Sequence, residues 1–294
     1  MKPKNACWAC VVVAAACVGS AADAQNPGAA SVRSPRLYVL EGGVLESDPT
    51  NYHLTADEVA TTQLSIAAYL IVHPQGILLW DAAAIADDER VSEDAGVVQR
   101  VVRTDGQERI VTLGPPLLAQ LAASGFRPAD VTYLALSHYH WDHTANANAF
   151  ANAIWLVRPA DRERMFAEDL PGGTRPSTYS ALRGSRTMSV TSPEHDVFGD
   201  GTVVLRSAPG HTEGHQVLYV ALEQTGPVVL SGDLYHYPEE RTLGRLPVGD
   251  VDVDRTAMSR RALEAFLSSS GARLWVQHDL VAHRTLKKAP AFYE

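Results

Sequence analysis

The densest group of reactive side chains in this sequence is the run His138-Tyr139-His140-Trp141-Asp142-His143. Its three imidazoles and one carboxylate offer the nitrogen and oxygen donors that bind divalent metal ions. If a strand continued through the run, His138 and His140 would share one face, because side chains alternate along a strand. Asp142 and His143 would follow at a turn and could reach a second ion. The run therefore predicts a metal centre.

Further candidate ligands follow apolar segments elsewhere in the chain. They are His211, Asp233 and His278, which come after residues 203–208, 228–230 and 274–276. A lone histidine is more commonly packed or solvated, and Asp233 alone could cap a helix. Their shared position at strand ends favours convergence on one edge of a sheet, so the prediction depends on the whole set.

The elements that would position these side chains alternate between strands and helices. We expect strands at 37–40, 66–72, 77–80, 131–136, 154–157, 202–206, 216–221, 228–230 and 273–276, and helices at 115–124 and 255–267. Residues 170–186 are expected to form a loop that shapes a substrate pocket, and residues 87–106 a surface excursion. No break in composition divides the chain, so we predict one α/β domain over residues 36–294.

The bulk composition limits the classes of partner. Apolar residues make up 46% and charged residues 20% of the chain, as in ordinary globular proteins. The formal net charge of −9 gives no electrostatic case for nucleic acid, whose binding depends on Lys and Arg neutralising phosphates. A small molecule is therefore the expected partner.

The N-terminus is typical of an export signal. Lys2 and Lys4 precede a mostly apolar stretch over residues 6–18, and Ala22-Asp23-Ala24 is a small-x-small cleavage site. This predicts a signal peptide over residues 1–24, cleavage after Ala24 and a periplasmic or secreted protein. The apolar stretch is shorter than the ~20 residues that span a bilayer, so no stable membrane span is expected after cleavage.

The cysteines follow the same division. All three lie inside the predicted signal, at Cys7, Cys10 and Cys17. Cleavage would leave no thiolate, and the metal centre must then use imidazole and carboxylate. The alternatives are a retained membrane anchor and a lipid-modified Cys17. Residues 25–35, rich in Ala, Ser, Gly and Pro, are expected to be a flexible mature N-terminus.

The order and approximate spacing of the candidate ligands resemble the metallo-β-lactamase superfamily over nearly all of the mature chain. The matching pattern is His138-x-His140-x-Asp142-His143, then His211, Asp233 and His278. This resemblance implies a four-layer αββα sandwich with the active site along one edge of its two sheets. In that family the residues matching His138, His140 and His211 hold one metal, those matching Asp142, His143 and His278 hold the other, and the equivalent of Asp233 bridges both.

Several positions favour one branch of that family. The β-lactamases generally lack a carboxylate like Asp233, whereas glyoxalase-like and lactonase-like members have it. Redox-active diiron relatives usually carry glutamate at the position of His140. Residues 209–216 and 277–293 are similar to the N-acyl homoserine lactonase branch. The donor set suits two divalent ions, with zinc (Zn²⁺) expected, and iron, cobalt or manganese could occupy the same ligands.

The resemblance implies an enzyme that opens lactone rings by attack of a metal-bridging hydroxide, with N-acyl homoserine lactones (quorum quenching) as the expected substrates. Asp142 is placed to pass a proton to the leaving alkoxide. Lactonases of this branch usually carry a substrate-contacting tyrosine three residues after the bridging aspartate. Here that position is His236, and the nearest tyrosine is Tyr235, so either could donate to the lactone carbonyl.

The same metal site admits other functions. A β-lactamase, another ester or thioester hydrolase, and a non-catalytic metal-dependent ligand-binding protein are the alternatives. Residues expected to hydrogen-bond the metal-binding imidazoles are Asp81, Ser137, Thr212 and His215. The other histidines, His53, His73, His195 and His283, are expected to be solvated.

Overall fold

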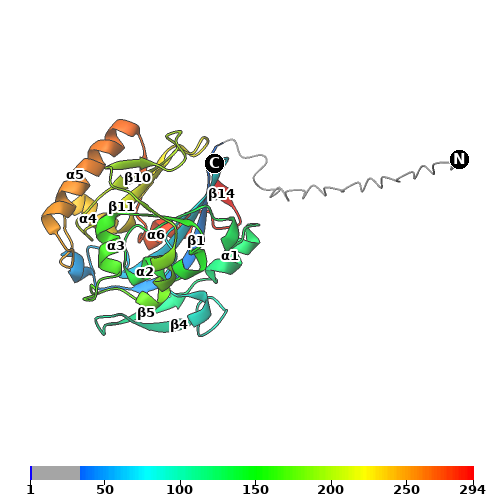
Figure 1. Cartoon of the computed structure of the whole chain (residues 1–294). Helices are drawn as coiled ribbons and strands as arrows, with labels where there is room; N and C mark the ends of the chain where they lie inside the picture. Colours follow the sequence, from blue (N-terminus) through cyan, green and yellow to red (C-terminus); the bar gives the residue numbers. More distant parts are fainter. Residues whose placement is uncertain (2–33) are drawn as a thin grey trace.

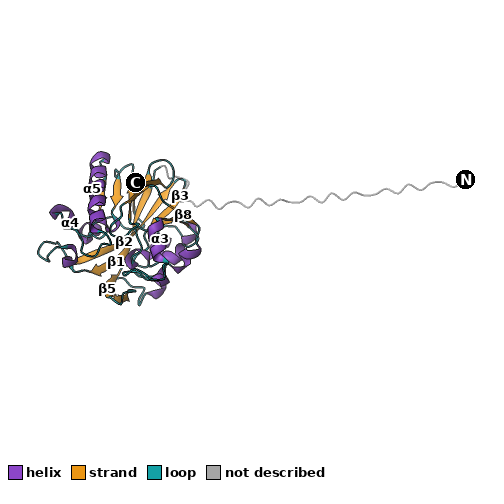
Figure 2. Cartoon of the chain, turned by 60° about the vertical axis from the view of Figure 1, so that its left-hand side comes forward, coloured by secondary structure: helices purple, strands orange, loops and turns teal. Residues whose placement is uncertain are grey.

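The computed structural model describes Met1 and residues 34–294. Two β-sheets face each other, and helices lie on their outer sides (Figures 1 and 2). The predicted signal peptide and nearly all of the predicted flexible segment 25–35 lie outside the described residues, so both stay predictions. In the part of the chain that the structure describes, none of the helices has the length and apolar character needed to cross a bilayer.

The larger sheet has nine strands within residues 34–294, in the order β4-β5-β1-β2-β3-β6-β7-β8, with β14 paired to β1. Their bounds are β1 Arg36–Glu46, β2 Gln63–His73, β3 Gly76–Trp80, β4 Val98–Val102, β5 Glu108–Leu113, β6 Tyr133–Ala135, β7 Ile154–Val157, β8 Thr187–Ser189 and β14 Phe292–Tyr293. Strands β3, β6, β7 and β8 are parallel neighbours, and the other pairs are antiparallel.

The smaller sheet has five strands in the same described part, in the order β13-β12-β11-β10-β9. They are β9 Glu194–Asp196, β10 Val203–Ser207, β11 Gln216–Val220, β12 Val228–Leu230 and β13 Arg273–Trp275. The α-helices are α1 Leu117–Ala123, α2 Trp141–Thr144, α3 Pro159–Met165, α4 Pro238–Leu243, α5 Val253–Ser270 and α6 Leu280–Thr285. Asp252 caps the start of helix α5 by accepting from the N–H of Arg255, and Gly271 follows its end in the left-handed conformation.

Strand β2 shows why the layers stack as they do. Almost every residue of this strand is buried, because both faces of the larger sheet are covered. Tyr69 and Ile71 pack in the core between the sheets, and the alternate residues Leu70 and Val72 pack in the core that includes α1. Residues Leu263 and Leu267 of α5 cover the outer face of the smaller sheet. These layers confirm the predicted αββα sandwich.

Three expectations about local structure were wrong. The strand expected at 131–136 is shorter and spans Tyr133–Ala135; the histidine run begins as a loop and enters α2 at Trp141, so the strand does not continue to His140. Residues 98–102 form β4, which pairs with the unpredicted β5, and are not a simple surface excursion. His73 and His283 are buried rather than solvated; His73 donates to Asp200 and stacks on Phe198, which offsets its burial.

Candidate metal centre

The seven predicted ligand residues lie together at one edge of the two sheets. Because β10, β12 and β13 run in the same direction, as do β3 and β6, the segments that leave their carboxyl ends meet at that edge. The loop after β6 and helix α2 supply His138, His140, Asp142 and His143, and the segments after β10, β12 and β13 supply His211, Asp233 and His278. All but His140 are buried.

One group of ligand atoms surrounds Nδ1 of His140. This nitrogen lies 2.8 Å from Nε2 of His138 and 2.9 Å from Nε2 of His211. The carboxylate oxygen Oδ2 of Asp233 completes the group, at 3.6 Å from His138 Nε2 and 3.3 Å from His211 Nε2. Three imidazole nitrogens and a carboxylate facing one point are the donor set of a divalent cation site.

The second group lies on the other side of the same carboxylate. Oδ1 of Asp233 is 3.0 Å from Nε2 of His143 and 3.0 Å from Nε2 of His278. Asp142 completes this group, with Oδ1 4.0 Å from His143 Nε2. Each oxygen of Asp233 therefore faces a different group, which is the geometry of a carboxylate that bridges two cations.

In three of the ligand imidazoles, hydrogen bonds fix which nitrogen is free to bind a metal. His143 donates from Nδ1 to Oδ2 of Asp81 at 2.9 Å, and His278 donates from Nδ1 to the carbonyl of Ser65 at 2.7 Å. His211 donates from Nδ1 to Oδ1 of Asp250 at 2.7 Å. In each ring the proton on Nδ1 leaves the lone pair on Nε2, which is the nitrogen directed at the cluster.

The electrostatics of the cluster also fit metal binding. Burial, followed by the neighbouring histidines, lowers the pKa of His138 and that of His140 well below the usual value, so both rings are neutral donors. Burial opposes ionisation of Asp233, but His143 and the other surrounding histidines hold the pKa of this carboxyl well below its usual range. His143 differs: burial opposes its protonation, but Asp233 and Asp81 raise the pKa of its imidazole well above the usual value, so a cation bound there would displace its proton.

The predicted supporting residues divide into two kinds. Asp81 and Ser137 contact ligands directly: Oγ of Ser137 lies 3.0 Å from Nδ1 of His138. His215 acts on the backbone instead, since its Nε2 accepts from the N–H of Asp233 at 2.9 Å. Thr212 makes no hydrogen bond to a ligand side chain among the described residues; its hydroxyl donates to the buried Asp161, which also accepts from the N–H of Gly214.

The two candidate substrate contacts, Tyr235 and His236, point in different directions. Tyr235 lies in the core under α5, where its hydroxyl donates to Oε1 of Glu264 at 3.1 Å and its ring packs against the guanidinium of Arg260. His236 lines the cavity beside the metal cluster, and its Nε2–H donates to Oδ2 of Asp233 at 3.1 Å. Only the histidine is therefore positioned to act on the cluster.

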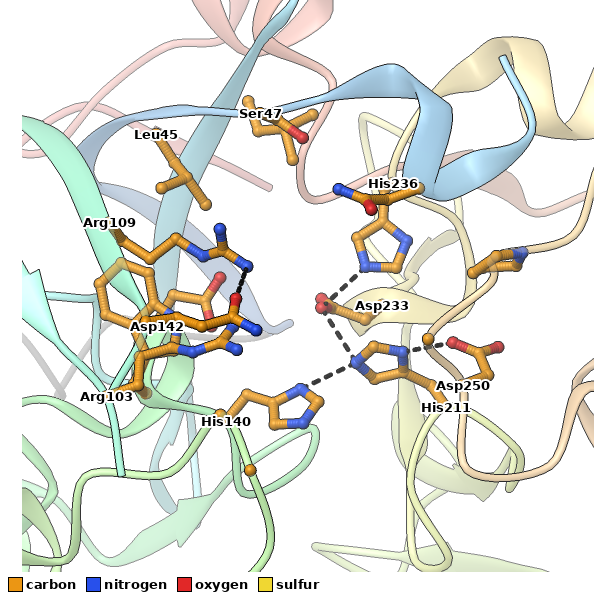
Figure 3. Close-up of a pocket in the computed structure, with 18 of the residues that line it drawn as sticks. Leu45, Ser47, Arg103, Arg109, His140, Asp142, His211, Asp233, His236 and Asp250 are labelled. Atoms are coloured by element: carbon orange, nitrogen blue, oxygen red, sulfur yellow. Dashed lines mark hydrogen bonds and ion pairs between the residues drawn. The ribbon is translucent and has the colours of Figure 1, made fainter. Parts of the chain in front are cut away.

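A cavity of about 490 Å³ opens over the cluster. Tyr52, at the end of the 3₁₀ helix Pro49–Tyr52, lines one side of this cavity together with Val248. The ring centroid of Tyr52 lies 4.4 Å from that of His236. Figure 3 shows Arg103 and Arg109 on the side opposite His211 and His236. Burial raises the pKa of Tyr52, so its hydroxyl stays protonated and can donate a hydrogen bond.

Comparison with known proteins agrees with this geometry. Residues 61–269 match the metallo-β-lactamase superfamily. The chain belongs to this superfamily. It is 32% identical over 273 residues to the N-acyl homoserine lactonase AttM of Azorhizobium caulinodans, and this alignment covers 88% of this chain and 98% of the relative. It is 24% identical to the N-acyl homoserine lactonase AiiA of Bacillus thuringiensis subsp. kurstaki, with 87% and 98% covered.

Solved structures of the superfamily share the fold. A 1.4 Å structure of an N-acyl homoserine lactone hydrolase, with the product N-hexanoyl-L-homoserine at its catalytic metal centre, superposes with a TM-score of 0.72 at 20% identity and covers 88% of this chain and 99% of that one. The dizinc quorum-quenching lactonase AidC superposes with a TM-score of 0.61 at 17% identity, covering 88% and 94%. These structures show that the chain has the superfamily fold. Its family and its lactonase relatives make it a metal-dependent hydrolase.

The sequence did not predict that Asp250, Tyr52, Arg103 and Arg109 belong to the site. Asp250 lies in the loop between α4 and α5, 39 residues from the histidine that it contacts. None of these residues belongs to the ligand motif, and none follows a predicted strand that ends at the site. Only the folded chain brings them to the cavity.

Proposed function

We propose that this hydrolase opens the ring of lactones, with N-acyl homoserine lactones as its first substrate class. The observation that carries the proposal is the pair of ligand groups on either side of Asp233, beneath one cavity. The relatives that cover almost the whole described chain are named N-acyl homoserine lactonases, which supports the substrate class. Zinc is the proposed metal, because nitrogen and oxygen donors suit it and AidC is a dizinc enzyme.

The chain's own residues have distinct tasks in this reaction. When bound, two divalent ions polarise an ester carbonyl and supply a nucleophile by lowering the pKa of water. His138, His140 and His211 would hold one ion, and His143, His278 and Asp142 the other, with Asp233 shared. His236 fixes the orientation of Asp233 through its Nε2–H. The carboxylate of Asp142 would carry a proton to the ring oxygen as it leaves.

We also propose that the enzyme is exported and works in the periplasm or outside the cell, as its N-terminal sequence predicts. Mass spectrometry of the protein from a periplasmic extract would test this. Export predicts a mature chain that begins at Gln25, whereas an intact chain confined to the cytosol would contradict it. A lipid-modified Cys17 would instead give a longer chain with an added fatty-acyl mass.

The substrate class is tested by measuring the ring opening of N-acyl homoserine lactones of several chain lengths, with proton release as the readout. The mature protein is loaded with zinc, and nitrocefin is assayed in parallel. We expect lactone turnover that is lost in the His140→Ala and Asp233→Ala variants. Nitrocefin turnover without lactone turnover would replace this proposal with a β-lactamase, and ligand binding without any turnover would indicate a binding protein.

A further inference from the structure

The cavity wall opposite His211 is formed by the hairpin of β4 and β5. The tip of this hairpin is fixed to the loop at residues 171–174. The N–H of Thr104 donates to the carbonyl of Thr174 at 3.0 Å, and the hydroxyl groups of the two threonines are hydrogen-bonded at 2.6 Å. The carbonyl of Gly173 in turn accepts from the N–H of Trp141, in the ligand run. The wall is therefore attached to the metal-binding segment and held in place.

Two guanidinium groups project from this wall into the cavity, as Figure 3 shows. Arg103 is already paired, since it binds the carboxylate of Asp105 through two nitrogens. Arg109 has no carboxylate within ion-pair distance among the described residues, and its only hydrogen bond there is to the amide oxygen of Gln107, at 3.1 Å. Its positive charge is thus left without a protein counter-charge in a partly buried position.

The acidic residues that line the cavity do not supply that counter-charge. Asp250 is bound to His211, and Asp233 and Asp142 belong to the metal cluster, with no ion pair between Asp142 and Arg109. Asp48 accepts from Thr50, and Glu46 accepts from Gln63, both at the exposed rim. A guanidinium held in a pocket by a fixed hairpin is matched by a planar carboxylate, which it can bind through two parallel hydrogen bonds.

We propose that Arg109 binds a carboxylate carried by the substrate at a distance from the scissile ester, so that the preferred lactones are anionic. This inference rests on the proposed lactonase function and narrows its substrate class. The lactone ring would lie over Asp233, and the acyl group would extend along the hairpin wall to Arg109. A wall with two arginines disfavours a long alkyl chain ending there, because burying that chain would strip water from a charge.

A pair of substrates of equal length tests the proposal. N-adipoyl homoserine lactone ends in a carboxylate, and N-hexanoyl homoserine lactone has the same number of acyl carbons but ends in a methyl group. The measured quantity is the ratio of their kcat/KM values in the zinc-loaded enzyme. We expect the ratio to favour the adipoyl lactone by about tenfold or more, as for other hydrogen bonds between charged groups.

The variant Arg109→Met should bring this ratio close to one. Arg109→Lys should give an intermediate ratio, because lysine keeps the positive charge but lacks the two parallel N–H donors of the guanidinium group. The matched control is Arg100→Met, on the same hairpin. Arg100 is 68% exposed, pairs with Glu108 and does not line the cavity, so the ratio should stay unchanged. Raising the ionic strength should reduce the ratio in the wild type only modestly, since the guanidinium is partly buried.

Calorimetric binding of the two ring-opened products separates this inference from the lactonase function. Tighter binding of N-adipoyl homoserine, lost in Arg109→Met, supports the carboxylate site even if neither lactone is turned over, in which case the proposed function alone fails. Equal binding of both products by the wild type, or equal loss in Arg109→Met and Arg100→Met, overturns the carboxylate site. Circular dichroism checks that each variant is folded.

Discussion

The hydrogen bond between Asp250 and His211 gives a sharp prediction about one of the two metal positions. The carboxylate accepts from Nδ1 of His211 at 2.7 Å, and only 1% of the Asp250 side chain is exposed. Its other oxygen accepts from the hydroxyl of Thr256, at the start of α5, so the carboxylate cannot readily turn away. In the Asp250→Ala variant, the imidazole would keep a buried N–H without a partner and would lose its fixed orientation.

The expected loss of metal affinity in Asp250→Ala follows from the burial of this hydrogen bond. A buried donor without a partner costs about 1–3 kcal/mol, which is roughly 5- to 150-fold in an equilibrium constant. Removing such a partner from a metal-binding histidine typically weakens metal affinity by about 10- to 100-fold. Because Asp250 contacts His211 and none of the second group, only one of the two ions should bind more weakly. Asp250→Asn should lose less metal affinity, since its amide oxygen can still accept the hydrogen bond from His211.

Competition between the protein and a zinc-binding dye measures the two affinities separately. The control is Asp254→Ala, which removes an exposed carboxylate from the same region of the chain. Two outcomes would refute the reasoning: affinities within twofold of the wild type in Asp250→Ala, or equal weakening of both ions. The melting temperature of the metal-free variant shows whether the contact with Thr256 matters for folding instead.

Three further predictions concern the same region. Asp233→Ala should reduce the bound metal from two ions to at most one per chain by elemental analysis, because both ligand groups share this carboxylate; two ions retained would contradict the bridge. Tyr235→Phe should keep kcat/KM within about twofold, whereas His236→Ala should lower it by tenfold or more, and the reverse order in lactone assays would refute their placement. Burial raises the pKa of Asp161 from 3.8 to about 7, so the folded state holds this proton more tightly than the unfolded state does. The resulting contribution to the free energy of unfolding is fully present below pH 3.8 and is lost as the pH rises through 7. In urea unfolding, the wild type should therefore lose stability relative to Asp161→Asn between pH 5 and 8, and a difference that is constant with pH would count against the raised pKa.

The ligand set could be predicted from sequence because its members are tied to simple local patterns. Four of them lie within one short run, and Asp233 and His278 each lie three residues after the end of an apolar strand. Parallel strands bring their carboxyl ends to one edge whatever the details of packing, so the convergence did not depend on knowing the loops. The expectation failed only in how the run is built, since β6 ends at Ala135 and a loop carries His138 and His140.

The choice between Tyr235 and His236 shows where sequence reasoning stops. Tyr235 has extended backbone angles, φ −141° and ψ 134°, so consecutive side chains here point to opposite sides and only one of the two could reach the cluster. Which one does so depends on where the turn after Asp233 ends. That turn is set by α5, whose Arg260 donates to the carbonyl of Leu234 at 2.7 Å, and no local pattern reports this distant contact.

The cavity wall was hidden for a different reason. Strand β4 is the outermost strand of the larger sheet, and Val98 and Val102 are exposed on it, so its alternation does not separate an apolar from a polar face. Its charged residues therefore suggested a surface segment. In the folded chain this edge hairpin turns its tip towards the site, and the same charges become part of the cavity.

Gly173 explains why this wall and the metal centre behave as one unit. Its φ is +78°, and a Cβ at this position would lie 2.8 Å from Cδ2 of His140, closer than packed atoms allow. The loop can therefore approach the ligand only because the residue is glycine, and in this position the carbonyl of Gly173 accepts from the N–H of Trp141 while the next residue, Thr174, binds Thr104 of the hairpin. A larger residue here would displace His140 and the hairpin tip together. Substrate contacts made by the hairpin and metal affinity should thus change jointly when this loop changes, whereas substitutions at Arg109 should alter substrate choice alone.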